Sequence, residues 1–290
     1  MNTVIIVDSS CDLPLEFIEN NDIPSLGLIC HLDEEEYIDD FGKTLTYEYF
    51  YKKIREGSMP TTSQINVYRF QELFEKYVKQ EKAIIYLAMS SKMSGCFSSA
   101  NIAKQLVEEE FQNADITVID TKSACIGEGL IVYNVYNMLK NGASKEEIVN
   151  WVEENKFNVH HWFIVEDLIH LKKGGRLSAV KANIGTLLKI KPVIYIDKEG
   201  GLKNVNNIRG RKKALKSLID KFEENMIDDE NQVIGISHGD CIKDALYLKE
   251  MVQERFKVKE IIINHVGPVI ASHTGVGMLS LCFIGKERVM

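Results

Sequence analysis

The sequence predicts a two-domain α/β protein. An N-terminal α/β/α domain with a largely parallel sheet is expected over residues 1–155, and a C-terminal α+β domain with a mixed sheet over 156–290. Three observations support this prediction. The 290 residues exceed the usual domain size of about 100–150. In the first half, short apolar runs alternate with segments of helical periodicity, which is typical of right-handed βαβ crossovers. The second half adds a hairpin signal around Glu199-Gly200-Gly201.

The N-terminal half alternates expected strands and helices. Strands are predicted where several apolar residues follow one another, and helices where apolar residues recur every three to four positions. Asp12 and Thr46 are expected to cap helix starts. The helix after residue 95 is expected to gather on one face Ile102, Ala103, Leu106, Val107 and Phe111. In chain order, the expected elements are strands at 4–7, 25–31 and 36–38, a helix from 46 to 57, a loop at 59–64, a helix over 67–78, a strand at 83–88, a loop at 89–95, a helix, a strand at 116–120 and a helix to about 139.

The C-terminal half mixes helices with antiparallel pairing. Ser144 and Glu147 have capping-box spacing, which predicts a helix ending near Glu154. A cationic helix is expected to open at Arg209. The other expected elements are a strand at 159–165, a glycine turn at 171–178 before a helix, a hairpin of 193–196 with 202–208, a strand at 233–237, a helix to about 255, and strands at 260–265 and 279–284.

The composition is that of an ordinary globular protein. Apolar residues make up 45% and charged residues 27%, which excludes a disordered, collagenous or coiled-coil chain. No apolar run approaches the ~18 residues that a membrane span needs. The 35 basic and 42 acidic residues give a net charge of −7. General nucleic-acid binding is therefore not expected, because such binding depends on neutralising phosphates.

The cysteines and the N-terminus indicate an intracellular chain. The six cysteines are scattered, without a C-x-x-C pair or a histidine at metal-ligand spacing, so no metal site is expected. Met1-Asn2-Thr3 leads directly into an apolar strand, without the basic region or cleavage site of a signal peptide. Reduced thiols and a cytoplasmic location are the expectation.

Two hydroxyl-rich segments form the strongest candidate site. One expected loop carries Thr61, Thr62 and Ser63, and the other carries Ser94 with serines at 90 and 91. Both precede expected helices, and the second follows a parallel strand, where ligands of open α/β sheets bind. Helix N-termini add N–H donors and partial positive charge, so hydroxyls placed there suit a small anion. Helix capping by these hydroxyls remains the alternative.

Three further features are candidates for function. His273, before Thr274 and Gly275, is either a hydrogen-bond donor to an anion or a satisfied histidine in a turn. The cationic run at 209–213 is either a solvated face or a docking patch for an acidic partner or a phosphate. Nucleophilic catalysis by Ser94 with His273 as base is also open, although the surroundings of Ser94 match neither G-x-S-x-G nor S-x-x-K.

Several short motifs, in this order, resemble those of DegV-family proteins across almost the whole chain. They are DSSCDLP at 8–14, PTTSQ at 60–64, SSKMSG at 90–95, LKKGGRLS at 171–178, VGP at 266–268 and HTG at 273–275. The chain departs from the family pattern at Ile65-Asn66, Cys96-Phe97 and Val276, which leaves the head-group residues in place but bears on chain preference.

The resemblance implies two α/β domains with a long-chain fatty acid held between them, its tail in an apolar tunnel. By motif position, Thr62 and Ser94 would bind the carboxylate, Thr61 would lie beside them, and His273 would lie close to the head group. In members tied to fatty-acid kinase, the protein is a carrier without a cofactor. A separate kinase subunit related to dihydroxyacetone kinases phosphorylates the carboxylate, and the acyl phosphate enters phospholipid synthesis. Arg176 and Arg209 would face that kinase.

The predicted function is therefore that of a non-enzymatic lipid-binding carrier. Burying a long acyl tail contributes about 0.8 kcal/mol per methylene, and neutral hydroxyls satisfy the carboxylate without drawing away its charge. Two alternatives stay open: a serine hydrolase or acyltransferase using Ser94 and His273, and a lipid-sensing module with no kinase partner.

Overall fold

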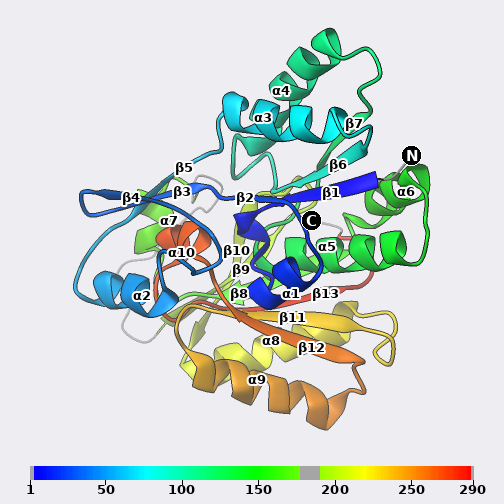
Figure 1. Cartoon of the computed structure of the whole chain (residues 1–290). Coiled ribbons are helices and arrows are strands. Elements are labelled where there is room, and N and C mark those ends of the chain that lie inside the picture. The colour runs from blue at the N-terminus through cyan, green and yellow to red at the C-terminus, as the bar shows by residue number, and fades with distance from the viewer. Residues whose placement is uncertain (1–2, 177–189, 289–290) are drawn as a thin grey trace.

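The computed structural model describes residues 3–176 and 190–288 and contains three sheets (Figure 1). The first is fully parallel, in the order β2-β1-β6-β7. Its strands are β1 (Thr3–Asp8), β2 (Ser25–Leu26), β6 (Ala83–Ala88) and β7 (Ile116–Asp120). Helices α3 (Val67–Val78) and α4 (Cys96–Glu110) cover one face. The other face is covered by α1 (Leu15–Asn20), α5 (Cys125–Lys140) and α6 (Lys145–Asn155).

The second sheet is mixed, in the order β10-β9-β8-β13-β11-β12. Its strands are β8 (Val159–Ile164), β9 (Ile190–Ile196), β10 (Leu202–Arg209), β11 (Val233–His238), β12 (Glu260–His265) and β13 (Leu279–Ile284). β11 and β12 pair in parallel, whereas the other pairings are antiparallel. Helices α8 (Arg211–Asn225) and α9 (Ile242–Arg255) pack on the outer face. Helix α5 packs on the inner face and is therefore shared by both sheets.

A third, smaller sheet lies where the two halves of the chain meet. It is antiparallel, in the order β4-β3-β5, and consists of β3 (Ile29–Leu32), β4 (Glu35–Ile38) and β5 (Thr61–Ser63). Helix α10 (Pro268–Thr274) contacts β3, β5, α7 (Ile169–Lys173) and the 3-10 turn η1 (Ser9–Cys11). Helix α2 (Tyr47–Arg55) joins the halves through Tyr51, whose hydroxyl donates to Val266 O at 2.7 Å.

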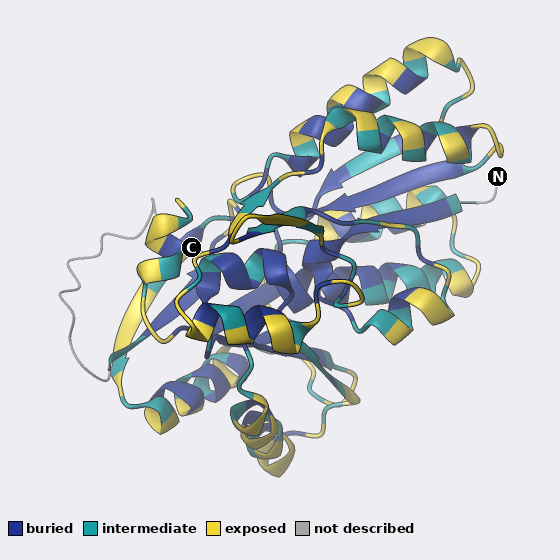
Figure 2. Ribbon diagram, turned by 60° about the vertical axis from the view of Figure 1, so that its left-hand side comes forward, coloured by how far each residue is buried: buried dark blue, intermediate teal, exposed yellow. Residues whose placement is uncertain are grey.

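The larger of two hydrophobic cores runs through both halves of the chain. It includes Ile6 of β1, Leu130 of α5 and Cys282 of β13. The central strands β1 and β6 of the parallel sheet are buried along almost their whole length (Figure 2). The second core lies between the mixed sheet and α8 and α9, around Phe222 and Phe283. Almost every residue in the first half of α5 is buried, because this helix is enclosed by β1, η1, β8, β11 and β13.

This architecture confirms the predicted fold class. The N-terminal sheet is parallel and flanked by helices on both faces, and the C-terminal sheet is mixed. The capping box also forms: Ser144 Oγ accepts from Glu147 N at 3.2 Å, and Glu147 Oε2 accepts from Ser144 N at 2.7 Å. Within the described chain, no sheet joins strands from both sides of residue 155. Among helices in the described ranges, none is long and apolar enough to cross a membrane.

Several element predictions were wrong. Thr61, Thr62 and Ser63 form the edge strand β5 rather than a loop, and the segment 25–31 divides between two sheets. Asp12 does not cap α1, whose N-cap is Pro14. Arg209 ends β10, and the cationic helix begins at Arg211. The helix expected after the glycine turn falls in 177–189, outside the described residues.

The buried face of α4 also differs from the expectation. Ile102 and Leu106 are 49% and 42% exposed, while Ala100, Ala103 and Val107 are buried. Small residues face inward because α4 packs against both α3 and β7, which brings the backbones close together. The two large side chains are left on the outer side of the helix.

Candidate functional site

A cavity of about 360 Å³ lies between the two halves of the molecule. Its lining is mostly apolar, and both halves contribute, for example Leu28, Met89, Phe163, Ile196, Val269 and Met278. The polar side chains on its wall include Thr62, Ser94, Arg176 and His273. The structure thus gathers four of the six predicted site residues at one cavity, although they lie far apart in the sequence.

Thr62 and His273 form a hydrogen-bonded pair at this cavity. Thr62 Oγ1 and His273 Nε2 are 2.8 Å apart. The contact arises because β5, which carries Thr62, packs against α10, which carries His273. Helix α3 is instead capped by Asn66, whose Oδ1 accepts from Arg69 N at 3.0 Å. Capping, the alternative for this segment, is therefore not the role of Thr62.

The imidazole of His273 is neutral at physiological pH. Burial, together with the positive charge of Arg176 and the neighbouring His170, lowers its pKa to about 4. His273 belongs to a helix rather than to a turn. Its Nδ1 is buried and has no hydrogen-bond partner among the described residues.

Ser94 lies at the start of α4 and is 9% exposed. Its Oγ accepts from Cys96 N at 3.2 Å and donates to Cys96 Sγ at 3.2 Å. The contact with Cys96 N satisfies a backbone N–H at the start of α4, as the alternative of helix capping predicts. A thiol is a weak acceptor, so the Ser94 hydroxyl proton can turn to a carboxylate oxygen with a net gain in hydrogen-bond strength.

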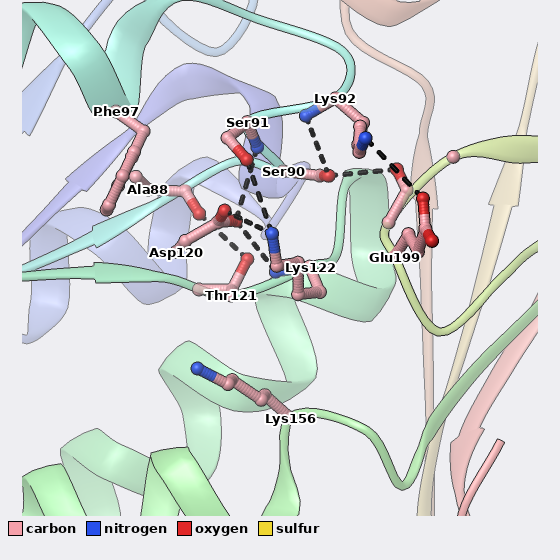
Figure 3. A network of polar contacts seen from close by, with 12 residues as sticks. Ala88, Ser90, Ser91, Lys92, Phe97, Asp120, Thr121, Lys122, Lys156 and Glu199 are labelled. Atoms are coloured by element: carbon pink, nitrogen blue, oxygen red, sulfur yellow. Dashed lines mark hydrogen bonds and ion pairs between the residues drawn. The ribbon is translucent and has the colours of Figure 1, made fainter.

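A network of polar contacts fixes the segment that leads to Ser94 (Figure 3). Asp120, at the end of β7, accepts from Ser91 N at 3.2 Å and from Lys122 Nζ at 2.7 Å. Ser90 Oγ donates to Gly200 O at 2.8 Å, in the turn between β9 and β10. The hydroxyl segment of the N-terminal sheet is thereby joined to the hairpin of the mixed sheet.

Gln64 connects the two hydroxyl segments directly. Its Nε2 donates to Ser99 Oγ of α4 at 2.8 Å, and its side-chain amide lies against Gly95. A Cβ on Gly95 would come within 1.9 Å of Gln64 Oε1, so only glycine leaves room for this contact.

Arg176 bridges the glycine turn and the Ser94 segment. Its Nε donates to Met93 O at 3.1 Å, and its Nη1 donates to Gly174 O at 2.7 Å. Arg176 and Ser94 also line a second, more polar cavity of about 550 Å³, together with Ser91, Lys92 and Glu199. They therefore stand between an apolar space and a polar one.

Two predicted residues lie outside the apolar cavity. Thr61 is exposed on β5, and Arg209 is exposed at the end of β10. The most strongly paired cation of the 209–213 run is Arg211, which contacts Glu166 at 3.1 Å and Asp244 at 2.9 Å. Within 3–176 and 190–288, no group of three or more His, Cys, Asp or Glu side chains is arranged to hold a metal ion.

Sequence reasoning missed His161, a buried histidine of β8 that lines the apolar cavity. It alternates with Val159 and Phe163, which face the same core. The sequence signal for this residue was a histidine at an inward-facing position of an otherwise apolar strand. The sequence identifies Gly174 only as part of a turn. In the structure its Cα lies against His273, and a Cβ on Gly174 would be 2.1 Å from His273 Nδ1.

Known proteins share this fold and much of this sequence. The model of a family described as "Uncharacterised protein, DegV family" matches residues 2–286. A DegV domain-containing protein of Clostridium perfringens is 48% identical over 285 residues, covering 98% of each chain. A DegV lipid-binding protein of Thermotoga maritima has a TM-score of 0.88 and 31% identity, over 99% of this chain and 100% of that one. DegV of Bacillus subtilis, a fatty-acid-binding protein, has a TM-score of 0.85 and 31% identity over the same shares. The chain therefore belongs to the DegV family.

Proposed function

We propose that this protein binds a long-chain fatty acid in the apolar cavity and presents the carboxylate to a separate kinase. The observation that carries the proposal is that Thr62, Ser94 and His273 come from three distant elements and line one apolar cavity. The similarity to DegV of Bacillus subtilis, a fatty-acid-binding protein, supports the ligand class.

The cavity suits a ligand with an apolar tail and one polar end. Each methylene transferred from water to the apolar wall contributes about 0.8 kcal/mol. The carboxylate would accept hydrogen bonds from Thr62 and Ser94, with Thr61 beside them. A buried carboxylate needs such partners, because leaving it without them would force it to take up a proton.

The Thr62–His273 pair sets a condition on the imidazole tautomer. Neutral histidine carries its proton on one nitrogen. If Nε2 carries it, Nε2 donates to Thr62 Oγ1 and leaves the threonine hydroxyl proton free for the carboxylate. We propose this tautomer for the bound state, with His273 orienting Thr62 at the head group.

The contacts of Ser94 favour a carrier over a serine hydrolase. A serine nucleophile requires a base within hydrogen-bond distance of its oxygen. In the described chain Ser94 Oγ contacts Cys96, whereas His273 Nε2 contacts Thr62. The hydroxyl and the imidazole that would have to cooperate are thus engaged with other groups.

The presentation step is proposed from the position of Ser94 and Arg176 between the two cavities. A carboxylate held there would face the polar space, from which a second protein can approach. We propose that the partner is a dihydroxyacetone-kinase-like fatty-acid kinase subunit, that Arg176 and Arg209 contribute to its docking, and that the pair acts in the cytoplasm, where the acyl phosphate serves phospholipid synthesis.

The binding test compares myristate with 1-tetradecanol on four proteins: wild type, Ser94→Ala, Thr62→Val and Ser98→Ala. Losing a hydrogen bond to a charged group costs about 1.5–3 kcal/mol, so the first two variants should bind myristate roughly ten- to a hundredfold more weakly. The alcohol should lose much less affinity. Ser98 lines only the polar cavity and is the control. Equal losses for acid and alcohol would contradict head-group binding by these hydroxyls.

An esterase assay separates the carrier from the hydrolase. A carrier shows no turnover of p-nitrophenyl esters above a Ser94→Ala background, whereas a hydrolase loses its turnover in that variant. Serine-dependent turnover by the wild type would overturn the carrier function.

A further inference from the structure

His161 places a further polar group on the wall of the apolar cavity, apart from the residues of the proposed head-group site. The residue is 2% exposed, and neither ring nitrogen has a hydrogen-bond partner among the described residues. It belongs to β8, whereas the head-group residues lie on β5, α4 and α10. The imidazole therefore lies on the wall formed by the mixed sheet, apart from the Thr62–His273 pair.

The surrounding fold accommodates this imidazole specifically. His161 pairs with Cys282 in the β8–β13 ladder, and its ring lies under the first turn of α5. A Cβ on Gly127 would come within 2.0 Å of His161 Nε2, so a glycine at this position lets the Nε2 edge of the ring pack directly against α5. Phe163, two residues along β8, and Cys282, the register partner of His161, also line the cavity, and neither supplies a strong hydrogen-bond partner.

The ring is neutral, so it offers one N–H donor and one bare nitrogen acceptor. Burial lowers the pKa of His161 well below its usual value, and the positive charge of Arg288 and the neighbouring His160 lower it further. The backbone of Val159 only partly opposes this lowering of the pKa. Arg288 is itself buried and donates to backbone carbonyls, including Lys156 O at 2.8 Å. Protonation of His161 beside this guanidinium would add a second buried positive charge without a carboxylate partner.

An imidazole without hydrogen-bond partners makes an unfavourable contact with a plain hydrocarbon chain. A saturated chain lying against His161 would keep both nitrogens away from water without satisfying either, which is unfavourable for buried polar groups. An alcohol on the chain would donate to the bare nitrogen or accept from the N–H. It can therefore pair with whichever nitrogen faces it, whatever the tautomer.

We propose that His161 is a specificity-determining residue that recognises a hydroxyl group on the hydrocarbon chain of the bound acyl ligand. The preferred ligands are hydroxylated long-chain fatty acids, and the preferred hydroxyl position is set by the path from the head group to His161. This inference rests on the proposed fatty-acid binding, and it adds the ligand subclass.

The test measures dissociation constants of stearate and of 3-, 10-, 12- and 17-hydroxystearate for the full-length wild-type protein. One isomer should bind about three- to tenfold more tightly than stearate, the gain expected for one net hydrogen bond. The remaining isomers should bind more weakly than stearate, because their hydroxyls are buried without a partner.

The substitution His161→Phe should remove the preference while keeping an apolar wall. The favoured isomer should then bind more weakly than stearate, so the ratio of the two constants should change by at least about tenfold. His161→Leu is the second variant if phenylalanine is not accommodated, and Ser98→Ala is the control.

The two proposals fail in different ways. If neither stearate nor any hydroxystearate binds, the proposed function is wrong. If stearate binds and no hydroxyl position improves affinity, or if the preference survives His161→Phe, the recognition by His161 is wrong while fatty-acid binding stands.

Discussion

At the scale of single residues, the central feature is the hydrogen bond between the Thr62 hydroxyl and the neutral imidazole of His273. Thr62 Oγ1 and His273 Nε2 are 2.8 Å apart, so His273 would act on the proposed carboxylate through Thr62 rather than by direct contact. His273→Ala should weaken fatty-acid binding only about two- to tenfold, the value of one neutral hydrogen bond. The rate of phosphorylation by an added kinase should fall by a larger factor than the affinity for fatty acid, because the carboxylate loses its orientation. Unchanged kinase turnover in a normally folded variant would remove His273 from the site.

Asp39 is expected to make the free energy of unfolding fall as the pH rises towards neutrality. It is buried after β4, and burial raises its pKa to about 7 although Phe41 N donates to it. A carboxyl whose pKa is higher in the folded state than in the unfolded state binds more protons when folded. Its contribution to stability is therefore complete at about pH 4 and is lost as the pH rises to about 7.

Asp39→Asn tests this contribution. The fall in the free energy of unfolding between about pH 4 and pH 7 should be smaller in the variant than in the wild type. Denaturant unfolding across this range measures the difference. Parallel curves for the two proteins would show that the pKa of Asp39 does not differ between the folded and unfolded states.

At the scale of elements, the turn after α7 positions His273. Gly174 has φ −74°, which alanine also adopts, so substitution there acts through contact alone. In Gly174→Ala the new Cβ would meet His273 Nδ1 at 2.1 Å. The overpacking should cost about 1–3 kcal/mol of stability and weaken fatty-acid binding by displacing the ring.

Gly175→Ala is the matched control for this turn. Nothing lies within 4 Å of its added Cβ, but its φ of +71° makes alanine unfavourable. It should lower stability without changing fatty-acid affinity. Equal affinity losses in both variants would mean that the turn itself, rather than the contact with His273, matters for binding.

Elements differ in how far the sequence determines them. The buried strands of the parallel sheet were predictable, because runs such as residues 83–88 are apolar throughout. The inner face of α4 was not, because alanines pack inward only where the partner helix approaches closely. The β5 strand was missed since its three residues are polar and their pairing partner, β3, lies about 30 positions earlier.

At the scale of the whole molecule, the site exists only because both halves contribute to it. The two hydroxyl segments and the HTG motif that begins at His273 were visible in the sequence, and their resemblance to the DegV family brought them together. His161 and the contact between Gly174 and His273 were not predictable, since both depend on how distant elements pack around the cavity.

The docking proposal also belongs to the whole molecule. Arg209 is exposed and lies outside the apolar cavity, so Arg209→Ala should leave fatty-acid affinity unchanged and slow acyl-phosphate formation by the added kinase. Arg176→Ala should slow it too, but Arg176 also holds Met93 and Gly174, so its effect on affinity must be measured separately. The exposed Lys257 is the control.

Salt dependence distinguishes docking from folding effects. Screening weakens attraction between exposed charges, so the wild-type rate should fall as ionic strength rises, and Arg209→Ala should fall less steeply. Wild-type rates in Arg209→Ala at low salt would exclude this residue from the docking surface.

The most direct measurement is organic extraction of the purified wild-type protein followed by mass spectrometry of the extract. Fatty-acid binding in the apolar cavity predicts a near-stoichiometric amount of long-chain fatty acid, which a Ser94→Ala, Thr62→Val double variant should retain in smaller amount. Several independent preparations that release no lipid, from a protein that also fails to bind added fatty acid, would contradict the account.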